Sequence, residues 1–250
     1  MPSQAEIKFV RSLRQKKFRE AENSFIAEGP KVVEELLASS LQVSKIFSEK
    51  DYADKKLRAK NVKDKIRVVS EAELKKISAL NTPNQVVAVA QIPERKVNHT
   101  SLNSSLIITL DGVSDPGNLG TIIRTAHWFG ISTIICSENC VDAWNPKVVQ
   151  AAMGSLFFVD VIQLNLQKFL SDKNITVHVY GCVLDGKSIY ESSLKSPGII
   201  LLGSESAGIS ANLRPFITHP VTIPAKEQKH KPDSLNVASA ASILCSQFFR

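Results

Sequence analysis

The feature that most constrains the fold is an unbroken apolar run, Leu106–Asp111, which leads through a loop containing Gly and Pro into a helical pattern at Asn118–Phe129. Continuous apolar strands are typical of parallel sheets covered on both faces. Strand and helix patterns alternate to the C-terminus, so we predict a parallel-sheet α/β domain. We expect its further strands at Thr133–Cys136, Phe157–Ile162, Val177–Val183, Ile199–Leu202 and Val221–Ile223, and its further helices at Pro146–Met153, Leu166–Asp172 and Ser234–Phe248.

The preceding residues predict a second, smaller α/β layer structure. An amphipathic helix is expected over Ile7–Arg19. Alternating strands and helices follow, with strands at Ser24–Glu28, Val43–Phe47, Ile66–Ser70 and Gln85–Gln91, and helices at Lys31–Ser39, Asp51–Lys60 and Glu71–Leu80. The stretch Ile92–Ser105 is polar and aperiodic, which favours a linker. We therefore expect domains at residues 1–94 and 106–250, joined by a linker at 95–105.

The composition is that of an ordinary globular protein, with 43% hydrophobic and 22% charged residues. No apolar run approaches the roughly 18 residues that a membrane span needs, and the N-terminus lacks the apolar core of a secretory signal. Cys136 and Cys140 have no second ligand pair, and Cys182 and Cys245 stand alone in apolar stretches. We expect a cytoplasmic protein with reduced, structural cysteines, no metal and no membrane contact.

The net charge of +7 is distributed unevenly along the chain. Residues 1–98 contain 20 Lys and Arg against 13 Asp and Glu, whereas residues 99–250 contain 11 of each kind. Basic side chains gain free energy by releasing the counterions condensed on nucleic-acid phosphates. The excess fits either a surface that binds a polyanion or an ordinary basic surface.

Polar residues follow three of the expected strands, at the edge where open α/β sheets bind ligands. After the first strand, Asn118 either caps the next helix or faces a ligand. Arg124 lies less than two turns further on, so its side chain either reaches the same end of the sheet or belongs to a solvated helix face. After Ile199–Leu202, Glu205 either faces a ligand or caps a helix. In the third segment Ser234 is a candidate cap for a helix rich in small residues, which permit close approach of a neighbouring element.

Together these segments resemble motifs 1, 2 and 3 of the SpoU/TrmH branch of the SPOUT methyltransferases. Motif 1 (D-P-x-N-x-G…R-T-A) is matched at residues 115–120 and 124–126, and motif 2 (G-S-E-x-x-G) at residues 203–208. Motif 3 (I-P…S-L-N-V) is matched at residues 223–224 and 234–237. Residues 25–29 (FIAEG) and the helix after them are similar to the family's N-terminal L30e-like substrate-binding domain.

The resemblance implies a SPOUT domain whose C-terminal segment forms a trefoil knot. It implies that S-adenosyl-L-methionine (AdoMet) binds in the knot, held largely by backbone groups of the motif 2 and motif 3 loops. By position, the cofactor-binding residues are Leu202, Gly203, Ile223, Leu235 and Ala238. The resemblance also implies a homodimer that shares the active site across its interface.

The implied chemistry is attack of an RNA ribose 2′-hydroxyl on the methyl carbon of AdoMet, with Arg124 beside that hydroxyl. A guanidinium is not readily deprotonated, so we expect Arg124 to orient the ribose and stabilise the developing alkoxide rather than to act as a base. We expect the nucleotide and Arg124 to be held by the remaining catalytic candidates, which are Asn118, Glu205, Ser234 and Asn236.

Motif 3 departs from the family pattern. Ala225 stands where the family usually has Met, the usual glycine is missing, and the connection Ala225–Asp233 is longer than usual. It carries Lys226, Lys229, His230 and Lys231. We expect the cofactor loop to differ here from that of other members, and its cations to offer a phosphate contact.

These observations predict an AdoMet-dependent RNA 2′-O-ribose methyltransferase. The L30e-like domain favours ribosomal RNA, since tRNA-specific members of the family lack it. The alternatives are a tRNA 2′-O-methyltransferase and a catalytically inactive RNA-binding factor associated with the ribosome. A nucleotide-dependent oxidoreductase needs a G-x-G-x-x-G motif followed by a ribose-binding acid, and the sequence has neither.

Overall fold

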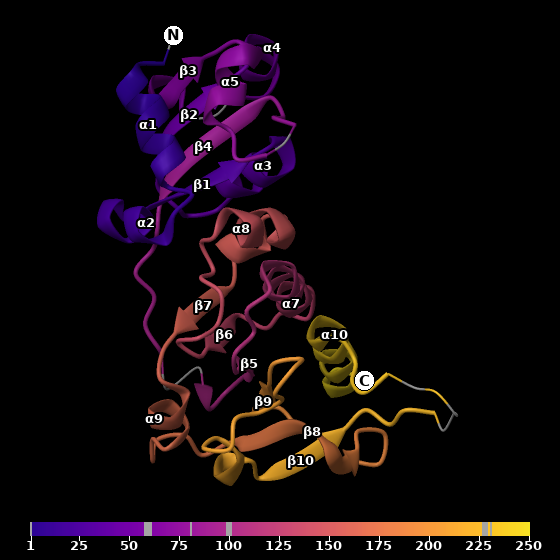
Figure 1. Cartoon of the computed structure of the whole chain (residues 1–250). Helices are drawn as coiled ribbons and strands as arrows, with labels where there is room; N and C mark the ends of the chain where they lie inside the picture. Colours follow the sequence, from indigo (N-terminus) through magenta and orange to yellow (C-terminus); the bar gives the residue numbers. More distant parts are fainter. Residues whose placement is uncertain (1, 58–61, 81, 99–101, 227–229, 231) are drawn as a thin grey trace. The chain divides into compact units, whose positions relative to one another are not determined.

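The computed structural model describes residues 2–57, 62–80, 82–98, 102–226, 230 and 232–250 (Figure 1). Contacts group the chain into two compact units. Unit 1 comprises residues 1–94 and 142–158, and unit 2 comprises residues 95–141 and 159–250. Unit 1 has a mixed sheet and unit 2 a parallel sheet, so the prediction of an α/β protein with a small first layer structure and a larger parallel-sheet domain is confirmed.

Unit 1 is built on a four-stranded sheet of order β1-β4-β2-β3. Strand β4 is antiparallel to both of its neighbours, and β3 is parallel to β2. All four predicted strands are present, as β1 (Ser24–Glu28), β2 (Val43–Ser48), β3 (Ile66–Val68) and β4 (Val86–Gln91). Its helices are α1 (Gln4–Ser12), α2 (Lys16–Glu22), α3 (Pro30–Ala38), α4 (Lys50–Tyr52), α5 (Glu71–Ile77) and α8 (Pro146–Ala152).

The single helix predicted over Ile7–Arg19 is wrong, because α1 and α2 are separated by a turn in which Gln15 is extended. The guanidinium of Arg14 ties this turn to the end of α5. Its Nη2 donates to the carbonyl oxygen of Ile77 at 3.2 Å and to that of Ser78. This contact spans more than sixty residues of sequence, so local periodicity gives no sign of it.

The helix predicted over Asp51–Lys60 is also shorter than expected. The chain makes only the brief helix α4 and then a wider π-helical turn at Ala53–Leu57. Leu57 is fully buried at the end of this turn. Residues 58–60 of the predicted helix lie outside the described residues.

Residues 142–158 are distant in sequence from the rest of unit 1. The Trp144 ring lies 4.5 Å and the Phe157 ring 5.9 Å, centroid to centroid, from the ring of Phe25 in β1. Gly154 approaches α3 so closely that an added Cβ would lie 2.5 Å from the Glu35 side chain. Sequence order places this segment in the second domain, whereas its contacts group it with unit 1.

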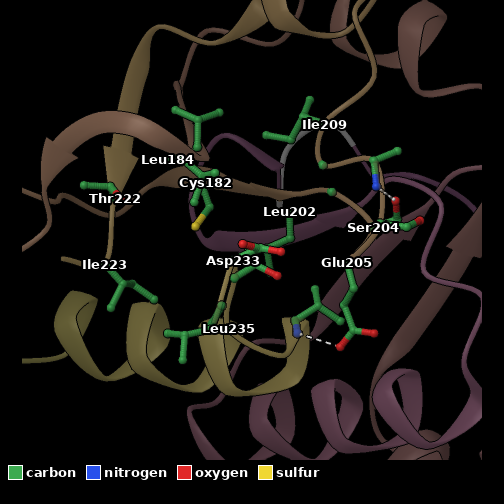
Figure 2. Close-up of a pocket in the computed structure, with 18 of the residues that line it drawn as sticks. Cys182, Leu184, Leu202, Ser204, Glu205, Ile209, Thr222, Ile223, Asp233 and Leu235 are labelled. Carbon is green, nitrogen blue, oxygen red and sulfur yellow. Dashed lines mark hydrogen bonds between the residues drawn. The ribbon is translucent and has the colours of Figure 1, made fainter. Parts of the chain in front are cut away.

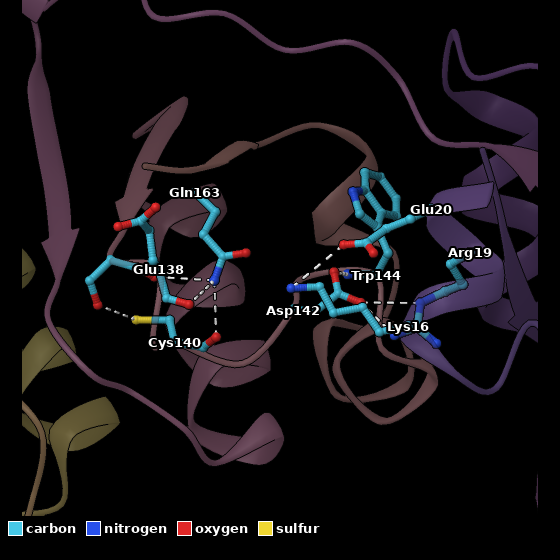
Figure 3. A network of polar contacts seen from close by, with 9 residues as sticks. Lys16, Arg19, Glu20, Glu138, Cys140, Asp142, Trp144 and Gln163 are labelled. Carbon is cyan, nitrogen blue, oxygen red and sulfur yellow. Dashed lines mark hydrogen bonds and ion pairs between the residues drawn. The ribbon is translucent and has the colours of Figure 1, made fainter. Parts of the chain in front are cut away.

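A buried ion pair fastens the same segment. Arg19, which is 2% exposed, donates from Nε and Nη2 to Oδ2 of Asp142 at 3.1 and 2.5 Å. Its Nη1 donates to the carbonyl oxygen of Leu13. The Asp142 Oδ1 accepts the backbone N–H of Trp144 (Figure 3). The guanidinium therefore satisfies groups from two distant parts of the sequence.

Unit 2 is built on a six-stranded sheet of order β10-β8-β9-β5-β6-β7, in which every neighbouring pair is parallel. All predicted strands are present, although β7 is shorter and β8 longer than expected. The strands are β5 (Leu106–Leu110), β6 (Thr133–Cys136), β7 (Asp160–Gln163), β8 (His178–Ser188), β9 (Gly198–Leu202) and β10 (His219–Thr222). The central strands β5 and β9 are buried along their whole length, as continuous apolar runs require.

The predicted strand over Phe157–Ile162 begins late because left-handed residues intervene. Met153 and Gly154 have φ angles of 51° and 95°, and a 3₁₀ turn at Ser155–Phe157 follows before β7 begins at Asp160. The helices of unit 2 are α7 (Pro116–Trp128), α9 (Leu166–Leu170) and α10 (Val237–Phe248). Helices α7 and α10 pack together, and the Thr125 and Ser242 hydroxyls lie 3.0 Å apart between them.

The pairing of β8 with β10 contains a large irregularity. Gly181 pairs with Pro220, but the next residue of β10, Val221, pairs with Lys187. Residues 182–186 therefore leave the sheet as an excursion from β8. Gly186 ends this excursion against the backbone of Val221, where an added Cβ would lie 2.4 Å from a carbonyl carbon, so no larger residue fits there.

The described part of the chain contains neither a candidate membrane-spanning helix nor a candidate metal site. No described helix is long and apolar enough to cross a membrane. Among the same residues, no group of three His, Cys, Asp or Glu side chains is placed to hold a metal ion. The four cysteines are free thiols.

The Arg19–Asp142 pair predicts a large effect on stability. Asp142→Ala leaves a buried guanidinium without its counter-charge, which costs about 3–5 kcal/mol. Denaturant unfolding of the full chain measures this loss. Glu20→Ala is the matched control, because it breaks the exposed Lys16–Glu20 pair at 3.7 Å (Figure 3) and should cost less than about 1 kcal/mol. Equal losses in the two variants would contradict the assignment.

Candidate active site

A cavity of about 590 Å³ opens beside the ends of β8, β9 and β10 in unit 2. Four of the predicted cofactor-binding residues line it, namely Leu202, Gly203, Ile223 and Leu235 (Figure 2). The fifth, Ala238, lies buried in the first turn of α10 and is not part of the lining. The position of this cavity at the carboxyl edge of a parallel sheet is the usual one for ligands in open α/β folds.

The motif 2 loop, residues 203–208, forms one wall of the cavity. It is closed by two backbone hydrogen bonds between Ser204 and Gly208, of 3.2 and 2.9 Å. The Ser204 hydroxyl also accepts the Ala207 N–H at 3.1 Å (Figure 2). An added Cβ on Gly203 would lie 2.0 Å from the Gly208 carbonyl carbon, so the tight loop requires glycine at this position.

Three side chains from the three motifs meet in one hydrogen-bonded network. Oε1 of Glu205 accepts from Nδ2 of Asn118 at 3.2 Å and from Nδ2 of Asn236 at 2.5 Å. Nδ2 of Asn236 also donates to Oδ1 of Asn118 at 2.8 Å. The same Glu205 oxygen accepts the backbone N–H of Val237, the first residue of α10, at 3.2 Å (Figure 2). The network therefore joins α7, the motif 2 loop and α10.

The observed helix caps show which of the candidate residues cap a helix. Asp115 caps α7 by accepting the Asn118 N–H at 2.8 Å, which leaves the Asn118 side chain for the network. Asn236, rather than Ser234, caps α10, because its Oδ1 accepts from Ala238 and Ser239. Ser234 instead lines the cavity. Glu205 does not cap a helix directly after it, but it binds the first N–H of α10.

Arg124 lies on the exposed surface of α7, one helical turn before Trp128. It lines neither the 590 Å³ cavity nor the smaller one beside it, and it has no hydrogen bond or ion pair with another described residue. The structure thus brings Asn118, Glu205 and Asn236 together, with Ser234 at the neighbouring cavity wall, and leaves the guanidinium of Arg124 open to solvent.

Sequence reasoning missed the wall formed by the β8 excursion. Cys182, Val183, Leu184 and Asp185 all line the 590 Å³ cavity, and the Leu184 side chain is 81% exposed (Figure 2). Burial raises the pKa of the Cys182 thiol to about 11, so this thiol is uncharged at neutral pH. The only signal in the sequence is Gly186, and a lone glycine near the end of a strand does not reveal a five-residue excursion.

A second, smaller cavity of about 240 Å³ adjoins the first. The two share the motif 2 residues 204–208 and Val237 as a common wall. On its other sides lie the end of β5, the motif 1 loop and the loop after β6, represented by Asp111, Gly112, Val113, Ser114, Asp115, Asn118 and Asn139. The sequence did not point to the loop after β6 at all.

Unit 2 is thus a parallel-sheet α/β domain with a cavity at the carboxyl edge of its strands. The SpoU rRNA Methylase family model matches residues 105–246, and the MRM3-like substrate binding domain model matches residues 4–88. The chain belongs to the SpoU rRNA methylase family, as its three motifs predicted. The predicted N-terminal substrate-binding domain is confirmed as well.

Relatives and solved structures agree with this assignment over nearly the whole chain. The chain is 32% identical to the 23S rRNA (guanosine(2553)-2′-O)-methyltransferase RlmP of Bacillus subtilis, over 95% of this chain and 93% of that protein. It resembles a TrmH-family protein from Porphyromonas gingivalis at 39% identity and a TM-score of 0.89, covering 99% and 98% of the two chains. It also resembles an AdoMet-bound rRNA methyltransferase from Sinorhizobium meliloti at 29% identity and a TM-score of 0.85, covering 99% and 95%.

The network predicts that Glu205 organises the cavity wall. Glu205→Ala removes the acceptor shared by Asn118, Asn236 and the Val237 N–H. Because the site is exposed to solvent, we expect a moderate effect, an AdoMet dissociation constant about tenfold higher by calorimetry. Glu205→Gln keeps an oxygen acceptor and should cost less. Glu191→Ala, at an exposed carboxylate that lines neither cavity, is the control; an equal loss there would refute the role of Glu205.

Proposed function

We propose that this chain is an AdoMet-dependent methyltransferase that acts on a ribose 2′-hydroxyl in ribosomal RNA. The observation that carries the proposal is the meeting of Asn118, Glu205 and Asn236, one residue from each motif, between two adjoining cavities. One cavity suits the cofactor and the other an acceptor. The B. subtilis and S. meliloti relatives, named as rRNA methyltransferases, support ribosomal RNA as the substrate class.

The 590 Å³ cavity fits AdoMet in size and in chemistry. Its volume falls within the usual range for small-molecule sites. Leu184, Leu202, Ile223 and Leu235 offer apolar contact to an adenine ring. The carboxylates Asp185, Glu205 and Asp233 outnumber Arg214 in the lining, which favours a cationic ligand. We propose that Leu202, Gly203, Ile223 and Leu235 contact the cofactor and that Ala238 supports the loop from α10. When bound, AdoMet supplies an electrophilic methyl group whose transfer leaves a neutral thioether.

The residues of this chain then have to align the acceptor and assist loss of its proton. We propose that Arg124 binds the acceptor nucleotide and stabilises the alkoxide that develops at the 2′-oxygen. Asn118, Glu205 and Asn236 position the motif loops, and Ser234 contributes a hydroxyl at the cavity wall. Arg124 is exposed and has no partner among the described residues, so its guanidinium is open to a phosphate or a ribose.

Unit 1 is the proposed RNA-capture module. The basic excess of the chain lies within residues 1–98, and the match to a substrate-binding domain model covers residues 4–88. A basic surface attracts the phosphate backbone without reading its sequence. A neutral catalytic half can then select the acceptor by contacts to the nucleoside itself.

Three further expectations of the family belong to this proposal. We infer that the C-terminal segment is threaded as a trefoil knot, that two copies form a homodimer sharing the active site, and that the protein works in the cytoplasm. We also propose domains at residues 1–94 and 106–250 with a linker at 95–105. Arg95 in this linker forms an ion pair at 3.1 Å with Asp160 of β7, which supports an ordered connection.

The direct test of the function is ribose-methylation mapping of total RNA from cells with and without the gene. We expect one 2′-O-methylated position of ribosomal RNA to be lost in the deletion strain and restored by the wild-type gene. Loss of a 2′-O-methylated position in tRNA instead would show that the substrate is tRNA and not ribosomal RNA. An unchanged map would overturn the proposed activity.

The same strain tests the role of Arg124. Arg124→Ala should not restore the methylation, because it removes the cation at the 2′-oxygen; we expect a loss of at least a hundredfold in the rate, on the scale of a lost oxyanion donor. Arg124→Lys should restore it poorly, since an ammonium lacks the planar fork of a guanidinium. Near-wild-type rates for Arg124→Lys at neutral pH, with Arg124→Ala inactive, would show that any cation suffices.

A further inference from the structure

The lining of the 590 Å³ cavity contains a single basic side chain among the residues that the structure describes, that of Arg214. The carboxylates of Asp185, Glu205 and Asp233 belong to the same lining. AdoMet carries one anionic group, the carboxylate of its methionine part, and two cationic groups, the α-ammonium and the sulfonium. The cavity therefore offers several partners to the cationic groups and one charged partner to the anion.

The guanidinium of Arg214 has N–H donors that no described residue uses. Arg214 begins the 3₁₀ turn Arg214–Phe216, and its Nε donates to the carbonyl oxygen of Ile209 at 3.5 Å. Within the described part of the chain, its Nη1 and Nη2 have no hydrogen bond or ion pair. These two nitrogens carry most of the donors of a guanidinium, so a carboxylate in the cavity can accept from both of them.

Arg214 is held at one side of the cavity. Ile209, whose carbonyl oxygen binds its Nε, directly follows the motif 2 loop and is 3% exposed. Figure 2 shows Ile209 on the side of the cavity away from Ile223 and Leu235. The last two offer apolar contact to an adenine ring. The adenine and the carboxylate of AdoMet lie at opposite ends of that molecule, so an adenine beside Ile223 and Leu235 directs the carboxylate towards Arg214.

The N-terminus of α10 is another place where a carboxylate could bind, but its N–H groups are already used. Val237, the first residue of α10, lines the cavity, and its N–H is bound to Oε1 of Glu205. The N–H groups of Ala238 and Ser239 are bound to Oδ1 of Asn236. The negative charge of Glu205 also repels a second anion at this helix end. A carboxylate therefore finds a better partner in the guanidinium.

We propose that Arg214 binds the carboxylate of the methionine part of AdoMet and thereby fixes the end of the cofactor that lies away from the adenine. This inference rests on the proposed function, and it adds a cofactor-binding residue that lies outside the three motifs. Two N–H···O bonds to one carboxylate fix its direction as well as its position. Because Arg214 is exposed, the contribution of the pair to binding is moderate.

The first test compares two ligands that differ only in the carboxylate. Decarboxylated AdoMet keeps the adenosine, the sulfonium and the amine of AdoMet. By calorimetry with the purified full chain, we expect it to bind about tenfold more weakly than AdoMet. Equal dissociation constants would overturn this inference and leave the proposed function intact. A wild-type protein that does not bind AdoMet would contradict the proposed function itself.

The second test removes the charge of Arg214. Arg214→Gln keeps a side-chain N–H donor for the carbonyl oxygen of Ile209. We expect the dissociation constant of AdoMet to rise about tenfold and that of decarboxylated AdoMet to change less than about twofold, because only AdoMet loses a partner. S-Adenosylhomocysteine has the carboxylate, so its binding should weaken in parallel with that of AdoMet. Equal weakening of AdoMet and decarboxylated AdoMet would overturn the assignment, since it would show an effect on the cavity as a whole.

The matched control is Lys187→Gln, which removes an exposed cation beside the β8 excursion and outside the lining. Its AdoMet dissociation constant should stay within about twofold of wild type, and both variants should keep the wild-type melting temperature. Arg214→Lys keeps the charge but loses the planar fork, so it should recover only part of the affinity for AdoMet. Wild-type binding of AdoMet by Arg214→Gln, or an equal loss in Lys187→Gln, would refute the contact.

Discussion

The site depends on a single carboxylate oxygen. Oε1 of Glu205 accepts hydrogen bonds from Asn118, from Asn236 and from the first N–H of α10. These partners come from chain segments up to 118 residues apart, and nothing in their local structure would bring them together. A carboxylate satisfies several donors at once, so one acidic residue fixes the ends of two helices and the loop between two cavities.

Arg19 and Arg124 lie in opposite environments, because the guanidinium of Arg19 is buried and that of Arg124 is exposed. Arg19 is 2% exposed and fully used, with Asp142 and the carbonyl oxygen of Leu13 as its partners. Such a group stabilises the fold of unit 1 and is not available to a ligand. Arg124 is exposed on α7 and unpaired among the described residues, which costs little in water and leaves the guanidinium for a substrate.

The strands of unit 2 could be predicted from the sequence because buried parallel strands are continuous apolar runs, as in Leu106–Leu110. The residues of the network were found through motif order, although their mutual contacts were not. The break between α1 and α2 escaped prediction because Arg14 bonds to the distant end of α5. The β8 excursion depends on tertiary register, and the orientation of the Asn139 amide depends on the hydroxyl of Ser137. Neither leaves a periodic trace in the sequence.

Titration of the whole chain with AdoMet by calorimetry tests most directly whether the 590 Å³ cavity beside Glu205 is a cofactor site. We predict saturable binding at one site per chain, with a dissociation constant in the micromolar range typical of enzyme substrates and competition by S-adenosylhomocysteine. A properly folded protein that gives no binding heat with AdoMet at millimolar concentration would contradict it.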